Sequence, residues 1–536
     1  MSEQERVDVV VVGAGMGGMY AVQRLRGEGL DVVGIEGAPD VGGVWFHNAY
    51  PGARVDGESL NYCYFFDPEL FRDWKWTEKF ATQPELLSYL NHVADRHDLR
   101  RHFLFETWVV GATWSENEDR WVIKTDTGRT IWARFLVMAT GNLSKARDPE
   151  FPGLADFEGE WVQASHWKPV EIAGKRVAVV GTGSSGVQAA SAIAKEAAEL
   201  HVLQRTPLYS VPARNRPADP AQHERMSARV EGMWEELLAT PGAITHLAPV
   251  GKTFDFAGEQ LEALLESRWL YGSTSILSLF TDTADDLKAN EIVGSYVARK
   301  NAERVRDPET AAKLTAYNVP IGVRRLILEI DYFEIFNQDN VHLVDVREDP
   351  IVRLVPSGIE LASGRVVELD TIVFALGFHA FTGSLDFANI TNHLGERPSD
   401  RWARGPATYL GLMTSGFPNL FTIAGPGSPT LTSNVCVANA QHIDVVGDLL
   451  AYMGERGYTR VEASPAAQKE WTEHAAELAE PLLRRKYDNY MVHVNEDDGS
   501  RVYMPYAGGM DRFVAKCRDV VANDFEGFDF ATGPSQ

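Results

Sequence analysis

Apolar and polar positions at the start of the chain predict a strand, a glycine-rich turn, a helix and a second strand. Residues 9–12 form a continuous β-branched run, which is typical of a strand buried on both faces of a parallel sheet. The loop GAGMGG follows, then apolar side chains at helical spacing in residues 19–26 and a second strand at residues 32–35. The spaced glycines of the loop are Gly13, Gly15 and Gly18. This order is typical of the opening of a dinucleotide-binding unit.

The same order returns later in the chain. Residues 177–180 predict a buried strand, the loop GTGSSG follows, and residues 187–193 predict a helix. A GxGxxG loop between a strand and a helix holds a pyrophosphate against the helix N-terminus. The residues of this second loop are Gly181, Gly183, Ser184, Ser185 and Gly186. One such loop is also compatible with a purely structural turn, but two copies in one chain indicate two nucleotide sites.

The residues that end the second strand of each unit differ. Glu36 ends the first, where a carboxylate accepts hydrogen bonds from ribose hydroxyls and repels a 2′-phosphate, so this site suits FAD or NAD. Arg205 and Thr206 stand at the matching place of the second unit, and an arginine there suits the 2′-phosphate of NADP. A surface arginine without a ligand is the alternative for Arg205. Together the two strand ends predict FAD first and NADPH second.

The rest of the chain predicts a helical insertion and late strands that close each unit. Residues 218–318 show charged amphipathic periodicity with few strand signals, and strands resume at 341–344 and 365–368. We therefore expect an α/β fold of two Rossmann-like domains. The expected bounds are 1–145 and 385–536 for the FAD-binding domain, 150–217 and 325–384 for the NADP-binding domain, and 218–324 for the insertion.

Composition narrows the class of protein. The 536 residues carry a formal net charge of −24, which argues against nucleic acid or an anionic membrane surface as the main partner. Cys63, Cys436 and Cys517 lack metal-ligand spacing, so we expect no metal site and a reducing compartment. No apolar run approaches the ~18 residues of a membrane span, and the first residues enter a strand without a signal sequence. We expect a cytoplasmic enzyme, monomeric or homodimeric.

A loop rich in glycine and aromatic residues follows the first unit. It contains Gly43, Val44 and Trp45, then Tyr50 and Asp56. Loops of this composition are often functional, which favours a contact with the cofactor. Core packing of the two aromatic side chains, and an ordinary turn position for Asp56, are the alternatives.

The motifs of this chain resemble those of the type I Baeyer-Villiger monooxygenases over nearly its whole length. The segments that carry the resemblance include GAGMGG, GGVWFHNAYPGARVDGES, VMATGNLS, GTGSSG, LQRTPLYSVPARN, RRLILEIDYFEIFN and FTIAGPGSP. Members of that family use FAD, NADPH and O2 to convert ketones into esters or lactones. The resemblance implies that NADPH reduces FAD, that a C4a-peroxyflavin attacks the ketone, and that sulfoxidation is a side activity.

The resemblance also implies roles for individual residues. It makes Arg325 the catalytic cation, places Asp56 beside it, and assigns Arg324 with Arg205 to the 2′-phosphate. The residues alone leave a simple salt bridge between strand and loop as the alternative for Arg325. The further cofactor-binding residues that it implies are Gly43, Val44, Trp45, Tyr50, Asp56, Tyr62, Gln83, Thr140, Gln188, Asn434 and Val435.

Two motifs depart from the family pattern. In the fingerprint F-x-G-x-x-x-H-x-x-x-W, Phe157, Gly159 and Trp167 fit, but Gln163 stands at the histidine position and a lysine follows the tryptophan. Near the C-terminus, Asp488-Asn489 and the acidic residues 493–500 replace a Ser-Trp pair and a basic loop. These departures bear on NADP binding, on lid closure and on the range of substrates.

Three other functions remain open from the sequence. The glutamine and the Trp-Lys pair of the fingerprint also suit a class B N- or S-hydroxylating flavin monooxygenase. An NADPH-dependent flavin reductase or oxidase shares the two-nucleotide layout, although its thiol version is disfavoured because no Cys-x-x-Cys motif is present. A flavoprotein that binds nucleotides without catalysis is the last alternative.

Overall fold

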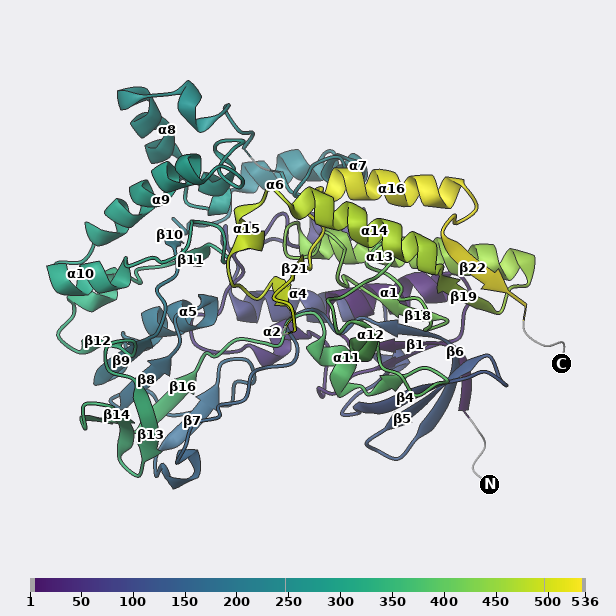
Figure 1. Ribbon diagram of the computed structural model, residues 1–536, viewed down its shortest axis with the longest axis horizontal. Helices are drawn as coiled ribbons and strands as arrows, with labels where there is room; N and C mark the ends of the chain where they lie inside the picture. Colours follow the sequence, from purple (N-terminus) through teal and green to yellow (C-terminus); the bar gives the residue numbers. More distant parts are fainter. Residues whose placement is uncertain (1–4, 246, 496, 533–536) are drawn as a thin grey trace.

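The computed structural model describes residues 5–245, 247–495 and 497–532. Two sheets lie side by side in the lower part of Figure 1. Helices α13 (Val435–Arg456), α14 (Pro465–Ala479) and α16 (Met510–Ala522) cover the larger sheet, and a helical lobe stands above the smaller one. The sequence prediction of an α/β fold with two Rossmann-type sheets is confirmed.

The larger sheet has the first glycine loop at the end of its central strand. Strand β1 (Glu5–Val12) pairs in parallel with β2 (Val32–Ile35) on one side and with β6 (Thr130–Met138) on the other, and its central valines are fully buried. Helix α1 (Met16–Gly27) packs against α13. The remaining strands of this sheet are β3 (Phe103–Leu104), β4 (Val109–Ser115), β5 (Arg120–Thr125), β17 (Ile390–Thr391) and β18 (Leu420–Thr422).

The smaller sheet repeats this arrangement around the second glycine loop. All five of its strands run parallel, and β8 (Arg176–Val180) leads through the loop into α5 (Ser184–Ile193). The other four strands are β7 (Glu160–Gln163), β9 (Glu199–Gln204), β12 (Val341–Asp345) and β16 (Thr371–Phe374). An antiparallel sheet adjoins it, formed by β13 (Ile351–Val355), β14 (Gly358–Leu361) and β15 (Val366–Glu368).

Between β10 (Ser210–Pro212) and β11 (Ile327–Glu329) the chain is helical among its described residues, as the charged periodicity predicts. Met233 and Leu237 belong to the hydrophobic core of the larger domain, whereas Leu265 and Val293 share a core with Phe80 from the first part of the chain. The insertion therefore contacts more than one core. Its helices are α6 (Pro220–Ser227), α7 (Val230–Leu238), α8 (Gly258–Tyr271), α9 (Leu287–Ala302) and α10 (Pro308–Leu314).

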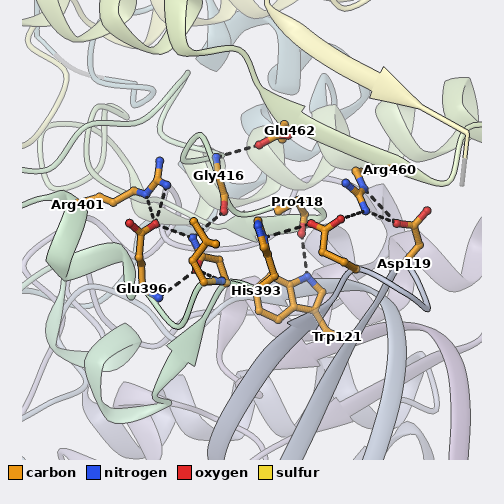
Figure 2. Close-up of polar contacts among 12 residues, drawn as sticks. Asp119, Trp121, His393, Glu396, Arg401, Gly416, Pro418, Arg460 and Glu462 are labelled. Atoms are coloured by element: carbon orange, nitrogen blue, oxygen red, sulfur yellow. Dashed lines mark hydrogen bonds and ion pairs between the residues drawn. The ribbon is translucent and has the colours of Figure 1, made fainter.

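The C-terminal part is fastened to the larger sheet by a polar cluster (Figure 2). The Arg460 guanidinium donates to Asp119 (2.6 Å) and to Glu116 (2.8 Å), both in the turn between β4 and β5. Trp121 donates its indole N–H to the carbonyl of Pro418 (2.9 Å). Because Asp119 is almost buried, its ion pair with Arg460 fixes the approach of β19 (Arg460–Ala463) to the sheet.

Shorter elements complete the chain. The loop region after β2 contains α2 (Val44–His47), α3 (Pro68–Asp73) and α4 (Gln83–Arg96), and the later ones are α11 (Gly383–Phe387), α12 (Pro398–Arg401), α15 (Leu483–Lys486), β20 (Val492–Val494), β21 (Arg501–Tyr503) and β22 (Phe528–Ala531).

Two linkers join the sheets and pair with each other. The N–H of Arg147 donates to the carbonyl of Gly377 (3.0 Å), and that of His379 donates to Lys145 (2.8 Å). The segments that follow β6 and β16 thus meet at the boundary between the sheets. Within the described ranges, no helix combines the length and the apolar character that crossing a membrane requires.

Candidate active site

The first glycine loop is shaped to receive an anion. Gly13 has a φ of +106°, and a Cβ there would lie 2.7 Å from the carbonyl oxygen of Ala139. At Gly18 a Cβ would lie 1.7 Å from the oxygen of Gly13, so only glycine permits this contact between helix and loop. Gly15 precedes α1 and no side chain caps the helix. The free N–H groups of the first turn therefore suit a pyrophosphate.

Glu36 lies beside this loop at the end of β2. Its carboxylate accepts hydrogen bonds from the N–H of Ala14 (2.6 Å) and of Ala38 (2.8 Å). Burial raises the pKa of Glu36, and the backbone donors partly oppose that effect. Because a carboxylate oxygen accepts more than one bond, both oxygens keep capacity for ribose hydroxyls.

The second loop has the same construction. Gly181 has a φ of +108°, and a Cβ on Gly186 would lie 2.0 Å from its oxygen. Gly183 precedes α5 without a side-chain cap, and Ser184 and Ser185 open the helix. The helix begins at Ser184, three residues earlier than the apolar pattern indicates, because the end of the loop is itself the first helical turn. For the same reason α1 begins at Met16 and not at residue 19.

Two arginines converge near the second loop. Burial lowers the pKa of Arg324, and the positive charge of Arg205 lowers it further, while Asp488 opposes both. The Nε of Arg324 donates to the backbone carbonyl of Asp488 (3.4 Å). Thr206 follows Arg205, and its carbonyl accepts from the Thr182 hydroxyl (2.9 Å). Two neighbouring cations, one of them also near the Asp488 carboxylate, are a suitable setting for a phosphate.

Asp56 and Arg325 form a bidentate ion pair, although they come from different parts of the chain. The Nε and one Nη of Arg325 donate to the two carboxylate oxygens of Asp56 at 2.6 and 2.7 Å. Burial alone would raise the pKa of Asp56, but the charge and hydrogen bonds of Arg325 outweigh it and lower the pKa. Arg325 nevertheless keeps 41% of its side chain exposed. The structure thus places a fixed, accessible cation where the loop with Asp56 meets the entry to β11.

The aromatic loop lies beside the first glycine loop. Trp45 donates its indole N–H to the Tyr62 hydroxyl (3.1 Å), and the two rings meet edge to face. The amide of Gln83 donates to the carbonyl of Trp45. Gly43, with a φ of +54°, approaches the first glycine loop, where its Cβ would lie 2.8 Å from the Cα of Gly15. Val44, next to it, is an exposed apolar side chain. This loop therefore lines the space next to the first glycine loop.

Tyr50 and Gln188 connect the domains directly. The Tyr50 hydroxyl donates to the side-chain oxygen of Gln188 (2.8 Å), whose amide donates back to the carbonyl of Arg54 (3.1 Å). At Gly52 a Cβ would lie 2.5 Å from the backbone oxygen of Gln188. The ring of Tyr50 packs within the core of the smaller domain, as the core-packing alternative for this residue expects.

Asn434 and Val435 stand at the start of α13. The side chain of Asn434 accepts from the N–H of Cys436 (3.1 Å) and donates to the carbonyl of Asn61. Val435 is half-buried. Thr140, at the end of β6, donates to the Ser384 hydroxyl (2.8 Å).

The fingerprint residues form the edge of the smaller sheet. Phe157 is buried in its core, and a Cβ on Gly159 would lie 2.4 Å from the oxygen of Asp370. Gln163 ends β7 and its amide donates to the carbonyl of Arg147 (3.2 Å) in the first linker. The N–H of Trp167 donates to the carbonyl of His47 (3.0 Å) in the other domain. Gln163 thus has a neutral hydrogen-bonding role at the domain boundary.

Sequence reasoning missed one residue beside the ion pair. Burial raises the pKa of Tyr490, and the positive charge of nearby Arg325 opposes that rise. The segment 488–500 drew attention only as a departure from the family pattern, and its single aromatic residue after Asn489 was the available signal. Glu496 of that acidic segment lies outside the described residues. Among the described residues, no cluster of three or more His, Cys, Asp or Glu side chains could hold a metal.

Comparisons with known proteins agree with this geometry. The pyridine nucleotide-disulphide oxidoreductase family matches residues 7–241. A Baeyer-Villiger monooxygenase of Pseudooceanicola batsensis is 36% identical over 94% of this chain and 93% of its own. The chain belongs to the Baeyer-Villiger monooxygenases. A 2-oxo-Δ3-4,5,5-trimethylcyclopentenylacetyl-CoA monooxygenase of Pseudomonas putida is 37% identical over 98% of each chain.

A solved structure supports the same membership. The NADP-bound steroid monooxygenase superimposes with a TM-score of 0.93 and 40% identity, covering 98% of this chain and all of that one. This Baeyer-Villiger monooxygenase is thus an NADPH-dependent flavoprotein monooxygenase with FAD and NADP as its cofactors. Each glycine loop leads into a helix without a side-chain cap, α1 or α5, and these two helix starts suit the pyrophosphates of FAD and NADP.

Proposed function

We propose that this enzyme inserts one oxygen atom from O2 next to the carbonyl of a ketone held beside Arg325, giving an ester or lactone. The observation that carries the proposal is the bidentate Asp56–Arg325 pair, which presents an exposed cation where the two domains meet. When bound, FAD and NADPH supply the reducing equivalents and the activated oxygen. The protein supplies position and charge.

The residues around each loop divide between the nucleotides. FAD would be held by the first glycine loop, Glu36, the loop with Trp45, and Asn434 with Val435 at the start of α13. NADP would be held by the second loop and by Arg205, Thr206 and Arg324. This division supports domain bounds of 1–145 with 385–536, and 150–217 with 325–384, joined by the insertion 218–324.

Arg325 has two tasks in this scheme. A guanidinium is always charged and carries only donors, so it favours an anionic oxygen next to it and stabilises the oxyanion that forms at the ketone carbon. Asp56 fixes the plane of the guanidinium, and the N–H groups that face away from Asp56 remain for the reacting atoms. The Asp56 carboxylate therefore orients the cation without reacting.

Composition bears on the cellular setting. The three buried free cysteines support a reducing compartment, and we infer that the enzyme works in the cytoplasm. We expect it to act on its ketone as a monomer or homodimer. Sedimentation of the FAD-loaded protein distinguishes the two assembly states.

The test measures ester formed per NADPH consumed over a panel of cyclic and linear ketones. We expect at least one ketone to yield its ester or lactone with the wild-type enzyme. In Arg325→Ala, NADPH should still reduce the flavin, but the enzyme should release hydrogen peroxide instead of ester. Arg325→Lys keeps the positive charge but lacks the bidentate guanidinium, so it should recover part of the ester yield. Wild-type oxygenation of an amine or sulfide by Arg325→Ala would favour the N- or S-hydroxylase instead.

A further inference from the structure

Two backbone hydrogen bonds hold the loop that carries Asp56. The N–H of Val55 donates to the carbonyl of Ala81 (3.1 Å). The N–H of Ser59 donates to the carbonyl of Lys79 (2.8 Å). Because these bonds lie on either side of Asp56 in the sequence, the position of this loop depends on how the partner segment with Lys79 is itself held.

The Lys79 side chain reaches into the helical insertion. Its ammonium donates to the carbonyls of Tyr271 (3.1 Å) and Gly272 (2.9 Å). Tyr271 is the last residue of α8, so these carbonyls belong to a helix C-terminus, where a cation is favourable. Gly272 has a φ of +68°, and a Cβ there would lie 2.6 Å from the carbonyl oxygen of Ala213. Glycine thus lets the end of α8 come close enough to meet Lys79.

Glu58 meets the same two residues from the side of Asp56. Its Oε1 accepts a hydrogen bond from the Tyr271 hydroxyl (2.8 Å) and lies 3.3 Å from the Lys79 ammonium. That ammonium also lies over the Tyr271 ring, 3.9 Å from its centre. Only 7% of the Lys79 side chain and 17% of the Glu58 side chain are exposed. Each buried charge therefore requires the partners that the other residues supply.

We propose that Lys79 and Tyr271 are positioning residues for Asp56, acting through Glu58, so that the helical insertion helps to place Arg325. The inference rests on the proposed function of Arg325. Glu58 is two residues after Asp56, and the residue between them is a glycine without a side chain to fix the loop. The Glu58 carboxylate therefore adds a third fixed point to the two backbone bonds.

The ion pair transmits any movement of this loop to the site. Asp56 binds Arg325 through two bonds of 2.6 and 2.7 Å, so the plane of the guanidinium follows the carboxylate. A displacement of about 1 Å at a reacting group costs about 100-fold in rate. A loosened loop would thus hold the cation away from the reacting oxygen, which then leaves as hydrogen peroxide.

Tyr271→Phe tests this in the FAD-loaded enzyme, because it removes the hydroxyl that binds Glu58 and keeps the ring beneath Lys79. The ester formed per NADPH should fall about 10-fold, in line with the loss of a hydrogen bond to a charged group. Hydrogen peroxide should account for the missing oxygen. The rate of flavin reduction by NADPH and the Michaelis constant for the ketone should stay near wild type.

Tyr296→Phe is the matched control. The Tyr296 hydroxyl also donates to a glutamate, but its partner Glu266 lies on α8 within the insertion. The same atom is therefore lost without a contact to the loop of Asp56, and the ester yield should remain at the wild-type level.

Two changes at Lys79 test the same contact from its other end. Lys79→Met removes the ammonium and should lower the ester yield at least as much as Tyr271→Phe does. Lys79→Arg keeps a positive charge and hydrogen-bond donors, so it should recover part of the yield. In an Asp56→Ala background, Tyr271→Phe should cause no further loss, because its effect passes through Asp56. Losses that add in the double variant would overturn the proposed route.

Hydrogen exchange at the N–H groups of Val55 and Ser59 reads the position of the loop whether or not ester forms. Both should exchange faster in Tyr271→Phe than in the wild type or in Tyr296→Phe, and unchanged exchange would overturn the inference. A wild-type enzyme that makes no ester from any ketone would refute the proposed function but not a change in exchange. If the wild type does make ester, a wild-type yield from both Tyr271→Phe and Lys79→Met would show that the positioning role is wrong.

Discussion

Asp56→Ala is the sharpest test of the ion pair at the centre of this site. The change removes both carboxylate oxygens that accept hydrogen bonds from Arg325. Without them, no carboxylate fixes the plane of the Arg325 guanidinium. The two bonds measure 2.6 and 2.7 Å, and a hydrogen bond to a charged group contributes about 1.5–3 kcal/mol. Because 41% of the Arg325 side chain is exposed, water competes for the same donors.

Allowing for this competition from water, we take about 2 kcal/mol as the contribution of the ion pair to holding Arg325 in place. Losing it should lower the fraction of enzyme with a correctly placed Arg325 by about 30-fold. Ester formed per NADPH should fall by roughly that factor. Reduction of FAD by NADPH should continue, since the residues proposed to bind both nucleotides are unchanged. The assay compares NADPH oxidation, ester and hydrogen peroxide in the same reaction.

The matched control is Asp119→Ala, which removes an arginine-bound carboxylate from the same domain at the cluster of Figure 2. It should lower thermal stability without changing the yield of the folded enzyme. A wild-type ester yield from Asp56→Ala would refute the orienting role. Because Arg325 lowers the pKa of Asp56, the pair stays charged above the ordinary carboxylate range, and its stabilising effect is lost only as pH falls below that range.

Two further predictions concern the cofactor and the fold. Replacing Arg205 and Arg324 together by Ala should raise the Michaelis constant for NADPH far more than that for NADH, and equal effects would remove both from the 2′-phosphate site. Burial raises the pKa of Asp444 to about 6 beside Arg24, so the folded state binds a proton that the unfolded state has released. Stability should therefore fall as pH rises from about 4 to about 6 in the wild type relative to Asp444→Asn, and parallel unfolding curves at all pH values would contradict this.

Some parts of the site are local in sequence and could be predicted from it. Each glycine loop is continuous with its strand and helix, so GAGMGG and GTGSSG predicted the two strand–loop–helix turns, and the strand pattern predicted that Glu36 ends β2 beside the first loop. The charged periodicity predicted the helices of the insertion. In these cases the residues that meet are a few positions apart, and strand and helix geometry alone brings them together.

Other parts depend on how distant segments pack. Asp56 and Arg325 are 269 residues apart in sequence, and only a resemblance to known proteins, not their spacing, placed them together. The Tyr50–Gln188 bond spans 138 residues and the domain boundary. No periodicity encodes such contacts, because they require both sheets to be folded and docked.

The sequence by itself therefore determined the two strand–loop–helix units and their order along the chain, since these follow from contiguous backbone geometry. Only the tertiary structure decided which carboxylate Arg325 meets. Asp56 comes from the loop after β2 and Arg325 from the entry to β11. Their pairing depends on how these two distant parts of the chain pack together, which no local pattern specifies.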